Sequence, residues 1–141
     1  MADPFRLESD VLGAEVAKAG VGKRLCGRIG GGATPWNQYA NAGLSHWYKV
    51  CASDGQNAYP YGNTYSGQSA VNGYEGVYDL SGNAWEWEDS CDGTSGNNDV
   101  CRLRGGSFYG YVDTHLRCDD GASYDRGNPG DSVGFRCCSS P

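Results

Sequence analysis

His115 and three neighbouring aspartates are the residues of this sequence whose types and spacing come closest to acid/base chemistry. Asp113 lies two residues before His115, and Asp119 and Asp120 form a pair of adjacent carboxylates. In an extended strand, residues i and i+2 share a face without being oriented as a proton relay, and no serine nucleophile is indicated beside them. Adjacent carboxylates on a strand point in opposite directions, so a shared site would need a turn. We therefore expect these side chains to be surface contact residues rather than a catalytic group.

Seven cysteines in 141 residues form the second group that could do chemistry. They contain no Cys-x-x-Cys pair and no His/Cys cluster, so their spacing does not indicate zinc. Cys91 and Cys101 bracket a polar loop, and a disulfide between them would close about ten residues and contribute about 3 kcal/mol. The thin apolar core favours disulfides, with one thiol left over. The alternative is that all seven are reduced, as in a cytosolic protein.

The composition bounds the class of protein. The chain has 23 glycines and 12% aromatic residues, which indicates many turns, little long helix and one domain. A net charge of −6 and a pI near 4.7 argue against a nucleic-acid or anionic-membrane partner, since both select a basic face. No stretch approaches the ~18 apolar residues of a spanning helix, so no membrane insertion is expected. The first residues, MADPFRLESD, lack the apolar segment of a signal peptide. The compartment stays unknown, although the cysteine content suggests exposure on a phage, virus or prokaryotic cell.

The pattern of apolar residues and turn residues predicts few and short elements in one α+β domain. Residues 7–19 form an amphipathic helical pattern capped by Ser9. Thr34 and Pro35 form a favourable start for a second helix, and a further helical turn is expected over 45–51. Strands are predicted at 76–80, 84–88, 101–108, 114–118 and 133–138.

Five pieces of sequence occur together: GKRL (22–25), AYPYGNTY (58–65), GVYDLSGNAWEWEDS (76–90), CRLRGGSF (101–108) and GFRCC (134–138). In order and spacing they resemble the sulfatase-modifying, formylglycine-generating enzyme family over most of residues 20–138. The resemblance implies that family's subtype of the C-type lectin fold, which is α+β, irregular and loop-rich, with short antiparallel strands and two or three short helices. Since the sequence shows no internal repeat and no linker, we expect a single domain of this type over residues 1–141. Residues 27–44 do not match, and the segment between 65 and 76 is shortened.

The matched pieces should form a structural frame. Trp85 and Trp87 are two residues apart, so both should point to one face of a strand and supply a large buried area. Arg104 and Arg136 should be partly buried and paired with an acid. The candidate partners are Glu86 and Asp79. The alternative is that these arginines clamp an anionic ligand.

The resembled enzymes bind copper through two cysteines that follow the Gly-Gly-Ser-aromatic motif, and they oxidise a substrate cysteine there. Gly110 and His115 stand at these two positions here. Glycine offers no ligand, and one histidine cannot replace a two-thiolate copper(I) site. A related branch holds iron with three histidines, whereas this chain has only two, His46 and His115. The resemblance therefore implies a frame without catalysis.

The same resemblance implies disulfide partners. Cys118 stands where the family has a structural cysteine, and it would pair with Cys51. Cys26 would pair with Cys137 or Cys138. Compared with the family, this sequence thus lacks the two catalytic cysteines but keeps the cysteines of the structural disulfides.

Calcium is the one cofactor that the resemblance could retain, and none is required. The family binds calcium near the Gly-Asn-x-Trp-Glu segment, where Asn83 and Glu86 offer hard oxygen ligands. The alternative is that Asn83 makes a turn and Glu86 pairs with an arginine.

The composition changes abruptly at Cys91 while the frame motifs continue. Residues 1–90 contain 16 Lys, Glu, Gln, Met and Trp residues, whereas residues 91–141 contain none. An AAC or AAT codon whose adenines are replaced by any base can encode Tyr, Asp, Asn, Ser, Gly, Thr, His, Ala or Val, but never the five missing types. This is similar to variable proteins of diversity-generating retroelements, which use this lectin-fold subtype and rewrite a C-terminal segment at adenines. The alternative is a Gly/Asp/Ser-rich loop region, which would also be poor in Lys and Met.

The region about 107–132 is then the expected variable ligand-binding region. Tyrosine supplies large, stiff contact area, and Ser, Gly, Asn and Asp supply adaptable hydrogen bonds, as in antibody loops. The frame residues would be Arg104, Gly105, Gly106, Ser107, Phe108, Leu116, Arg117, Cys118 and Phe135. The contact set would be Tyr109, Tyr111, Asp113, Thr114, His115, Asp119, Asp120, Ser123, Tyr124 and Asn128. Tyr109 and Tyr111 should share a strand face and form the first aromatic hot spot.

These observations together predict a non-catalytic ligand-binding protein whose partner is a protein or another cell-surface ligand. Two alternatives from other classes are an oxidoreductase of the formylglycine-generating type and a calcium-dependent glycan-binding domain.

Overall fold

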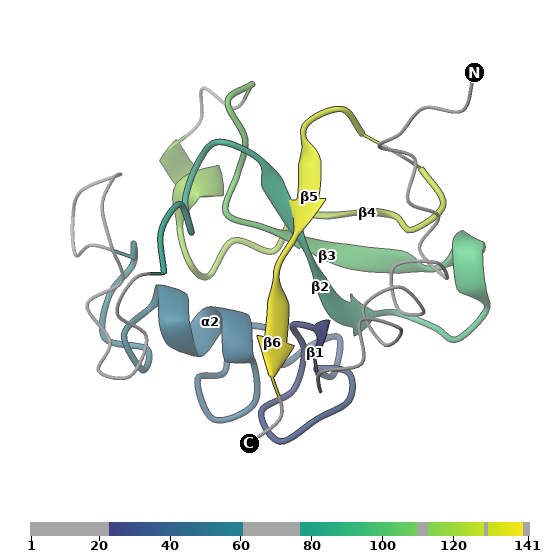
Figure 1. The fold of residues 1–141 in the computed structure, drawn as a ribbon, viewed down its shortest axis with the longest axis horizontal. Helices are drawn as coiled ribbons and strands as arrows, with labels where there is room; N and C mark the ends of the chain where they lie inside the picture. Colours follow the sequence, from purple (N-terminus) through teal and green to yellow (C-terminus); the bar gives the residue numbers. More distant parts are fainter. Residues whose placement is uncertain (1–22, 61–76, 110–112, 129, 140–141) are drawn as a thin grey trace.

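The protein is an α+β chain of short strands and few helices in a computed structural model, which describes residues 23–60, 77–109, 113–128 and 130–139 (Figure 1). The described elements are β1 (Lys23–Leu25), α2 (His46–Cys51), β2 (Trp85–Cys91), the 3-10 helix η1 (Gly96–Asn98), β3 (Val100–Arg104), the 3-10 helix η2 (Asp113–Leu116), β4 (Ser123–Asp125), β5 (Val133–Phe135) and β6 (Cys137–Ser139). The helix predicted over 7–19 lies outside the described residues. Within the described residues, no helix has the length and apolar character needed to cross a membrane.

Two sheets organise the chain. The larger has the order β4-β3-β2-β5, and the smaller pairs β1 with β6, so that the two ends of the described chain meet (Figure 1). The β2–β3 and β3–β4 pairs are antiparallel, whereas β5 runs parallel to β2. The parallel pair corrects the prediction of antiparallel strands alone.

Strand β2 buries its acidic side chains and not its tryptophans. Along the strand, Glu86, Glu88 and Ser90 are buried, while Trp85 and Trp87 are only partly buried. The prediction that both tryptophans share a face is correct, but the expectation that this face is the buried one is wrong. The acids can turn inward because Arg104 of β3 and Arg136, which lies between β5 and β6, neutralise them.

Two ion pairs stabilise this inner face. Arg104 Nε lies 3.3 Å from Glu88 Oε2, with both side chains fully buried. Burial raises the pKa of Glu88, and the nearby charge of Arg104 opposes that shift. Arg136 donates to both carboxylate oxygens of Glu86, with Nε at 3.1 and 3.0 Å. The expected pairing of both arginines with acids is thus confirmed, although the partner of Arg104 is Glu88 instead of the proposed candidates.

The helical turn predicted over 45–51 is confirmed as α2. Ser45 caps the helix by accepting a hydrogen bond from the Tyr48 N–H at 3.0 Å. Trp47, Val50 and Cys51 are buried in the main hydrophobic cluster.

The helix predicted after Thr34 and Pro35 is wrong, because this segment consists of successive turns. Two carbonyls that a helix would use for its own hydrogen bonds instead accept from arginine side chains. Arg102 Nη2 donates to the Trp36 carbonyl at 3.1 Å, and Arg104 Nη2 donates to the Tyr39 carbonyl at 3.3 Å.

Strand boundaries differ from the prediction where the backbone needs glycine. The strand expected over 101–108 ends at Arg104, because Gly105 and Gly106 take φ values of +85° and +72°. A Cβ on Gly105 would lie 2.6 Å from the Leu80 carbonyl oxygen, so the two segments approach too closely for any side chain.

Other strand predictions also need correction. The segment 114–118 contains most of η2 in place of a strand, and 133–138 is divided between β5 and β6. The described part of 76–80 forms no named strand. Strands β1 and β4 were not predicted. The strand expected over 84–88 is confirmed as β2.

Three disulfides join elements that are distant in sequence. They link Cys26 with Cys138, Cys51 with Cys118, and Cys91 with Cys101. The predicted pairs are all confirmed, and Cys137 is the exposed thiol left over.

Replacing Cys51 and Cys118 together by serine should lower the free energy of unfolding by about 4 kcal/mol, because this bond spans a sequence separation of 67. The corresponding change at Cys91 and Cys101 should cost about 3 kcal/mol, since the separation is 10. Equilibrium urea unfolding measures both. Cys137→Ser is the matched control and should leave the midpoint unchanged; equal midpoints for all three variants would contradict the assigned pairing.

Candidate functional site

The first group of predicted contact residues gathers around η2, and we call it the η2 patch. It comprises four predicted contact residues, Tyr109, Asp113, Thr114 and His115, and also Phe108, which was predicted as a frame residue. Phe108, Tyr109, Asp113 and Thr114 are exposed, and the His115 side chain is 41% exposed. The patch is therefore available to a partner on most of its side chains.

The loop before β2 supports the η2 patch through alternate residues. The Ser81 hydroxyl donates to the Leu116 carbonyl at 2.7 Å, and the Asn83 carbonyl accepts from the Phe108 N–H at 3.0 Å. The Trp85 ring meets the His115 ring edge to face at 5.5 Å between centroids. Three successive odd-numbered positions of the Ser-Gly-Asn-Ala-Trp segment thus hold the patch in place.

The second group lies on β4 and the turn after it, and we call it the β4 patch. It comprises Ser123, Tyr124 and Asn128, which are all exposed. The Asn128 amide donates to the Tyr124 hydroxyl at 3.0 Å. Tyr124 pairs in register with Cys101, which itself pairs with Cys91 at the end of β2.

The two patches lie beside opposite ends of β2. His115 contacts Trp85 at the start of that strand, whereas Tyr124 is aligned with Cys91 at its end. Six residue steps at about 3.3 Å place Trp85 and Cys91, the two ends of β2, roughly 20 Å apart. The predicted contact set therefore forms two separate surfaces rather than one.

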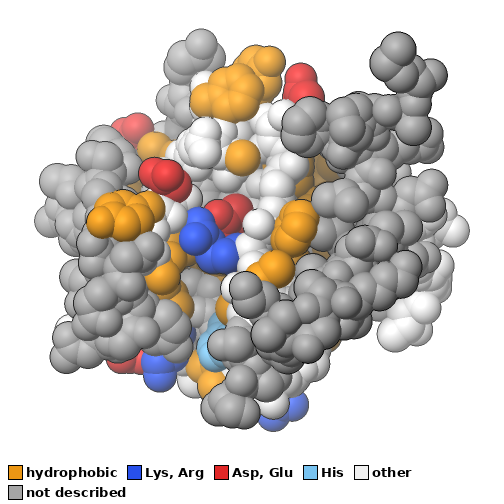
Figure 2. Space-filling view, viewed as in Figure 1, with side chains coloured by type: hydrophobic (Ala, Val, Ile, Leu, Met, Phe, Trp, Pro, Cys, Tyr) orange, Lys and Arg blue, Asp and Glu red, His pale blue; other side chains and the backbone are white. Residues whose placement is uncertain are grey.

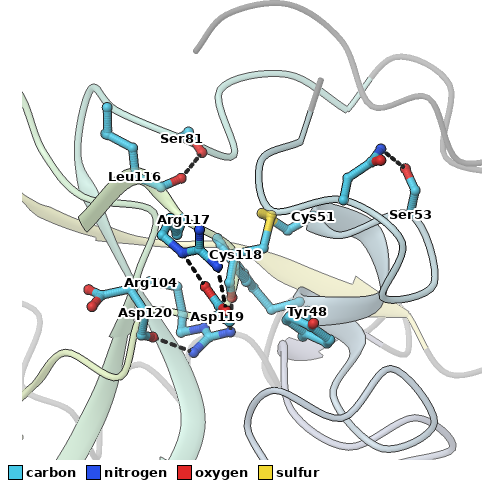
Figure 3. The surroundings of a disulfide bond; sticks show 12 residues. Tyr48, Cys51, Ser53, Ser81, Arg104, Leu116, Arg117, Cys118, Asp119 and Asp120 are labelled. Atoms are coloured by element: carbon cyan, nitrogen blue, oxygen red, sulfur yellow. Dashed lines mark hydrogen bonds and ion pairs between the residues drawn. A yellow bond between two sulfur atoms is a disulfide. The ribbon is translucent and has the colours of Figure 1, made fainter. Parts of the chain in front are cut away.

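Asp119 and Asp120 lie between the patches and face different partners. Arg117 donates to both oxygens of Asp119 at 2.8 Å, and this hydrogen bonding lowers the pKa of Asp119 (Figure 3). Asp120 Oδ2 lies 3.1 Å from Nδ1 of His115, and its side chain is only 18% exposed. The two carboxylates form no shared site, and the partner of His115 is Asp120 instead of Asp113.

Main-chain atoms hold the segment between the patches. Arg104 donates to the carbonyls of Cys118 at 2.7 Å and Asp120 at 2.9 Å (Figure 3). Arg102 donates to the Gly121 carbonyl at 2.6 Å, and the Cys118 N–H donates to the Ala58 carbonyl at 2.8 Å. These bonds fix the course of the chain without using the side chains of the exposed residues.

Two residues expected in the frame, Phe108 and Phe135, are in fact exposed, and Arg117 is half-buried. Phe108 is 60% and Phe135 is 38% exposed, and the Arg117 side chain is 40% exposed. Tyr109 lies in a turn beyond β3, so the strand argument for a shared face with Tyr111 does not hold. Tyr111 itself lies outside the described residues, as does Gly110.

Three residues that support the site were not predicted from the sequence: Ser81, Glu88 and Arg102. A usable signal was present: Glu86 and Glu88 are two apart in one strand, and arginines 102 and 104 are two apart in the next. Matching spacing of opposite charges on paired strands indicates an internal ion-pair layer.

Of the two residues proposed for calcium, Glu86 is already paired within the protein, and Asn83 contributes its main chain. Asn83 sits in a turn with φ +65°, and its carbonyl holds Phe108. Glu86 accepts from Trp47 Nε1 at 2.8 Å and from Arg136. Calcium at Glu86 would have to displace Arg136, so the donor set fits the ion poorly. Among the described residues, no three His, Cys, Asp or Glu side chains group as metal ligands.

A copper site of the enzyme type also fits poorly. Six of the seven cysteines are in disulfides, and the remaining thiol, Cys137, lies on β6, which pairs with β1. His115 Nδ1 lies 3.1 Å from Asp120 Oδ2, and the ring packs against Trp85. Two thiolates cannot meet at this position while the disulfides are intact.

Comparison with known proteins places these observations in a family. Residues 14–141 match the sulfatase-modifying factor enzyme 1-like domain, so the chain belongs to that family. No curated protein matches. The fold is similar to a solved structure described as the crystal structure of CarF, with a TM-score of 0.51 and 18% sequence identity. The match covers 95% of this chain and 64% of that chain, so this chain spans less than two thirds of its length.

Glu88→Gln should lower the free energy of unfolding by about 3 kcal/mol or more, because loss of one partner leaves the Arg104 charge buried and uncompensated. Hydrogen exchange of the amides near Cys118 should accelerate at the same time, since Arg104 holds that backbone. Urea unfolding and native-state hydrogen exchange provide the two readouts.

The matched control is Asp54→Asn, which breaks the exposed ion pair with Lys49 at 3.2 Å. Its cost should stay below about 1 kcal/mol. Asparagine tolerates the φ of +59° at this position, so backbone strain does not confuse the comparison. Similar losses in the two variants would contradict the role assigned to the buried pair.

Proposed function

We propose that this protein is a non-catalytic ligand-binding protein that displays a diversified surface on a C-type lectin scaffold. In this proposal it is the variable protein of a diversity-generating retroelement. The observation that carries the proposal is the way the segment 116–121 is held: its carbonyls accept from Ser81, Arg102 and Arg104. A surface held by its backbone can change side chains without losing its shape.

The composition of the exposed positions supports this proposal. The described contact residues are Tyr, Asp, Thr, His, Ser and Asn, all of which adenine replacement in AAC or AAT codons can produce. Residues that support them, such as Trp85 and Glu88, lie before the point at which the composition changes. The residue types of the exposed positions thus agree with the expected variation, while two further supporting residues, Arg102 and Arg104, lie after the change in composition.

The absence of catalysis in this proposal rests on the donor chemistry. The two positions that carry the catalytic thiols in the resembled enzymes hold Gly110 and His115. The disulfides use the cysteines that could otherwise replace them.

The compartment and partner follow from the same features. Three disulfides favour an oxidising environment outside the cytosol. Two contact surfaces roughly 20 Å apart favour a protein or cell-surface ligand over a small molecule. No cofactor is required in this proposal, because Glu86 already has arginine as its counter-charge.

A library test measures whether the proposed surface tolerates variation. Adenine-replaced AAC codons would be introduced together at Tyr109, Asp113, Thr114, Ser123, Tyr124 and Asn128, and the clones displayed on phage. Most clones should resist protease, because single surface substitutions change stability by about 0.5 kcal/mol or less. A control library at the buried residues Ser81, Arg102, Leu103, Arg104 and Ser107 should yield few resistant clones.

The outcome against the proposal is equal protease sensitivity in the two libraries. Sequencing the gene and its flanks in several isolates gives an independent test. A nearly identical non-coding copy, with differences almost only at template adenines, is expected. A constant 109–128 segment in all isolates and no such copy would remove the retroelement from the proposal.

Loading with copper(I) and a cysteine-containing peptide separates the proposal from the oxidoreductase alternative. Oxygen consumption should not exceed that of free copper, because no pair of thiolates is available at His115. The control is the protein with its disulfides reduced, which tests whether freed thiols create an artificial site. Catalytic oxygen uptake by the oxidised protein would overturn the non-catalytic assignment.

A further inference from the structure

The η2 patch exposes two aromatic rings side by side. Phe108 and Tyr109 are each 60% exposed, and their ring centroids lie 4.2 Å apart at an angle of 36°. The Phe108 N–H is bound to Asn83, so the backbone under this pair is fixed. Two exposed rings on a fixed backbone form an apolar ledge with negative π faces.

Two exposed carboxylates lie on segments that are joined to the segment under this ledge through residues 83–85. Asp113 begins η2, and Asp131 precedes Ser132, whose carbonyl accepts from the Trp85 N–H at 2.8 Å. Trp85 in turn contacts His115 in η2. Neither Asp113 nor Asp131 has an ion-pair partner within the described parts of the chain. Their charges are therefore open to a ligand.

The arginines around this surface are already neutralised or buried. Arg117 is bound by both oxygens of Asp119, and Arg102 and Arg104 are buried within the protein. In the upper part of the face in Figure 2, where the turn after β3 and the loop before β5 lie in Figure 1, the coloured side chains are hydrophobic or acidic. With a net charge of −6, the chain also attracts cations at long range.

The protein already uses the combination of arginine and aromatic ring in its interior. The Arg102 guanidinium lies 3.6 Å from the Trp36 ring centroid and 4.0 Å from that of Tyr39. The Arg104 guanidinium lies 4.6 Å from the Trp47 ring centroid. A ligand cation over an exposed ring would make the same kind of contact, and Arg104 combines that contact with a carboxylate partner, Glu88.

We propose that the η2 patch of this sequence binds a lysine- or arginine-bearing segment of a protein partner. The cation lies against the rings of Phe108 and Tyr109 and pairs with Asp113 and Asp131. This inference rests on the proposed function, because it names the ligand class for one of the two proposed contact surfaces. It also gives Phe108 a role as an aromatic anchor beside the varied positions.

Selection of a random peptide library against the whole protein tests this inference without choosing a sequence in advance. Enriched peptides should be rich in Lys and Arg. Their binding to the Asp113→Asn, Asp131→Asn double variant should weaken about tenfold or more, since two charge pairs are lost. Phe108→Leu with Tyr109→Leu should weaken binding about threefold or more while keeping the surface apolar.

The matched control is the Asp54→Asn, Asp79→Asn double variant, which makes the same change in net charge at exposed aspartates elsewhere. Both positions have positive φ values that asparagine tolerates. Basic peptides should bind this control within about twofold of the unmodified protein, because steering alone affects affinity weakly.

The outcomes separate the inference from the proposed function. Acidic or uncharged peptides that depend on the η2 patch would keep the binding function and overturn the cationic ligand. If basic peptides bind the Asp113, Asp131 variant and the Asp54, Asp79 control with equally reduced affinity, the η2 patch is not their binding site. If no selected peptide depends on either patch, with Tyr124→Ala and Asn128→Ala as the β4 variant, the binding function loses its support as well.

Discussion

The buried ion pair between Glu88 and Arg104 is the interaction on which the rest of the structure depends. Both side chains are fully removed from solvent, so every remaining donor of the guanidinium needs an acceptor inside the protein. The acceptors are main-chain carbonyls of Cys118, Asp120 and Tyr39. The buried Arg104 side chain therefore holds the backbone of Cys118 and Asp120 at fixed positions through hydrogen bonds.

The carbonyl is an acceptor that every residue type possesses. A frame that holds a segment by hydrogen bonds to the carbonyls of that segment therefore does not depend on which side chains the segment carries. The disulfide between Cys51 and Cys118 adds a covalent fixed point in the same region (Figure 3). At Gly106 the requirement is opposite: a Cβ there would lie 3.0 Å from the His115 carbonyl oxygen, and φ is +72°. Side chains at the exposed positions can thus vary, whereas any residue other than glycine at position 106 would be strained.

The sequence predicted the parts of the fold that depend on local pattern. It predicted β2 and α2, and the resemblance supplied two of the disulfides. It could not predict which face of β2 is buried, because alternation shows which residues share a face and not which face lies inside. Glu86 and Glu88 turn inward only because arginines distant in sequence neutralise them. The absent helix after Pro35 has the same origin, since Arg102 and Arg104 take carbonyls that a helix would use.

For the candidate site, residue types were predictable and their grouping was not. Most of the contact residues are exposed as expected, because Tyr, Asp, Ser and Asn in Gly-rich turns have little to pack against. Their division into two patches depends on two long-range contacts. Strand β4 pairs with the first half of β3, whereas η2, which precedes β4 in the chain, contacts Trp85 through His115. That arrangement needs long-range contacts that no local pattern contains. Phe108 was placed in the frame because its motif is a frame motif, yet its ring points to solvent.

The division into two patches limits the kind of ligand that can use both. A span of roughly 20 Å exceeds the reach of a small molecule and is close to the width of a standard protein interface of about 800 Å² per partner. A small or flexible ligand would contact one patch and gain little from the other. A folded partner could contact both at once, and the rigidity supplied by Arg102 and Arg104 would then reduce the ordering cost of binding. The buried charges that hold the backbone are thus the physical reason why a surface of short turns keeps one backbone shape, as the proposed binding function requires.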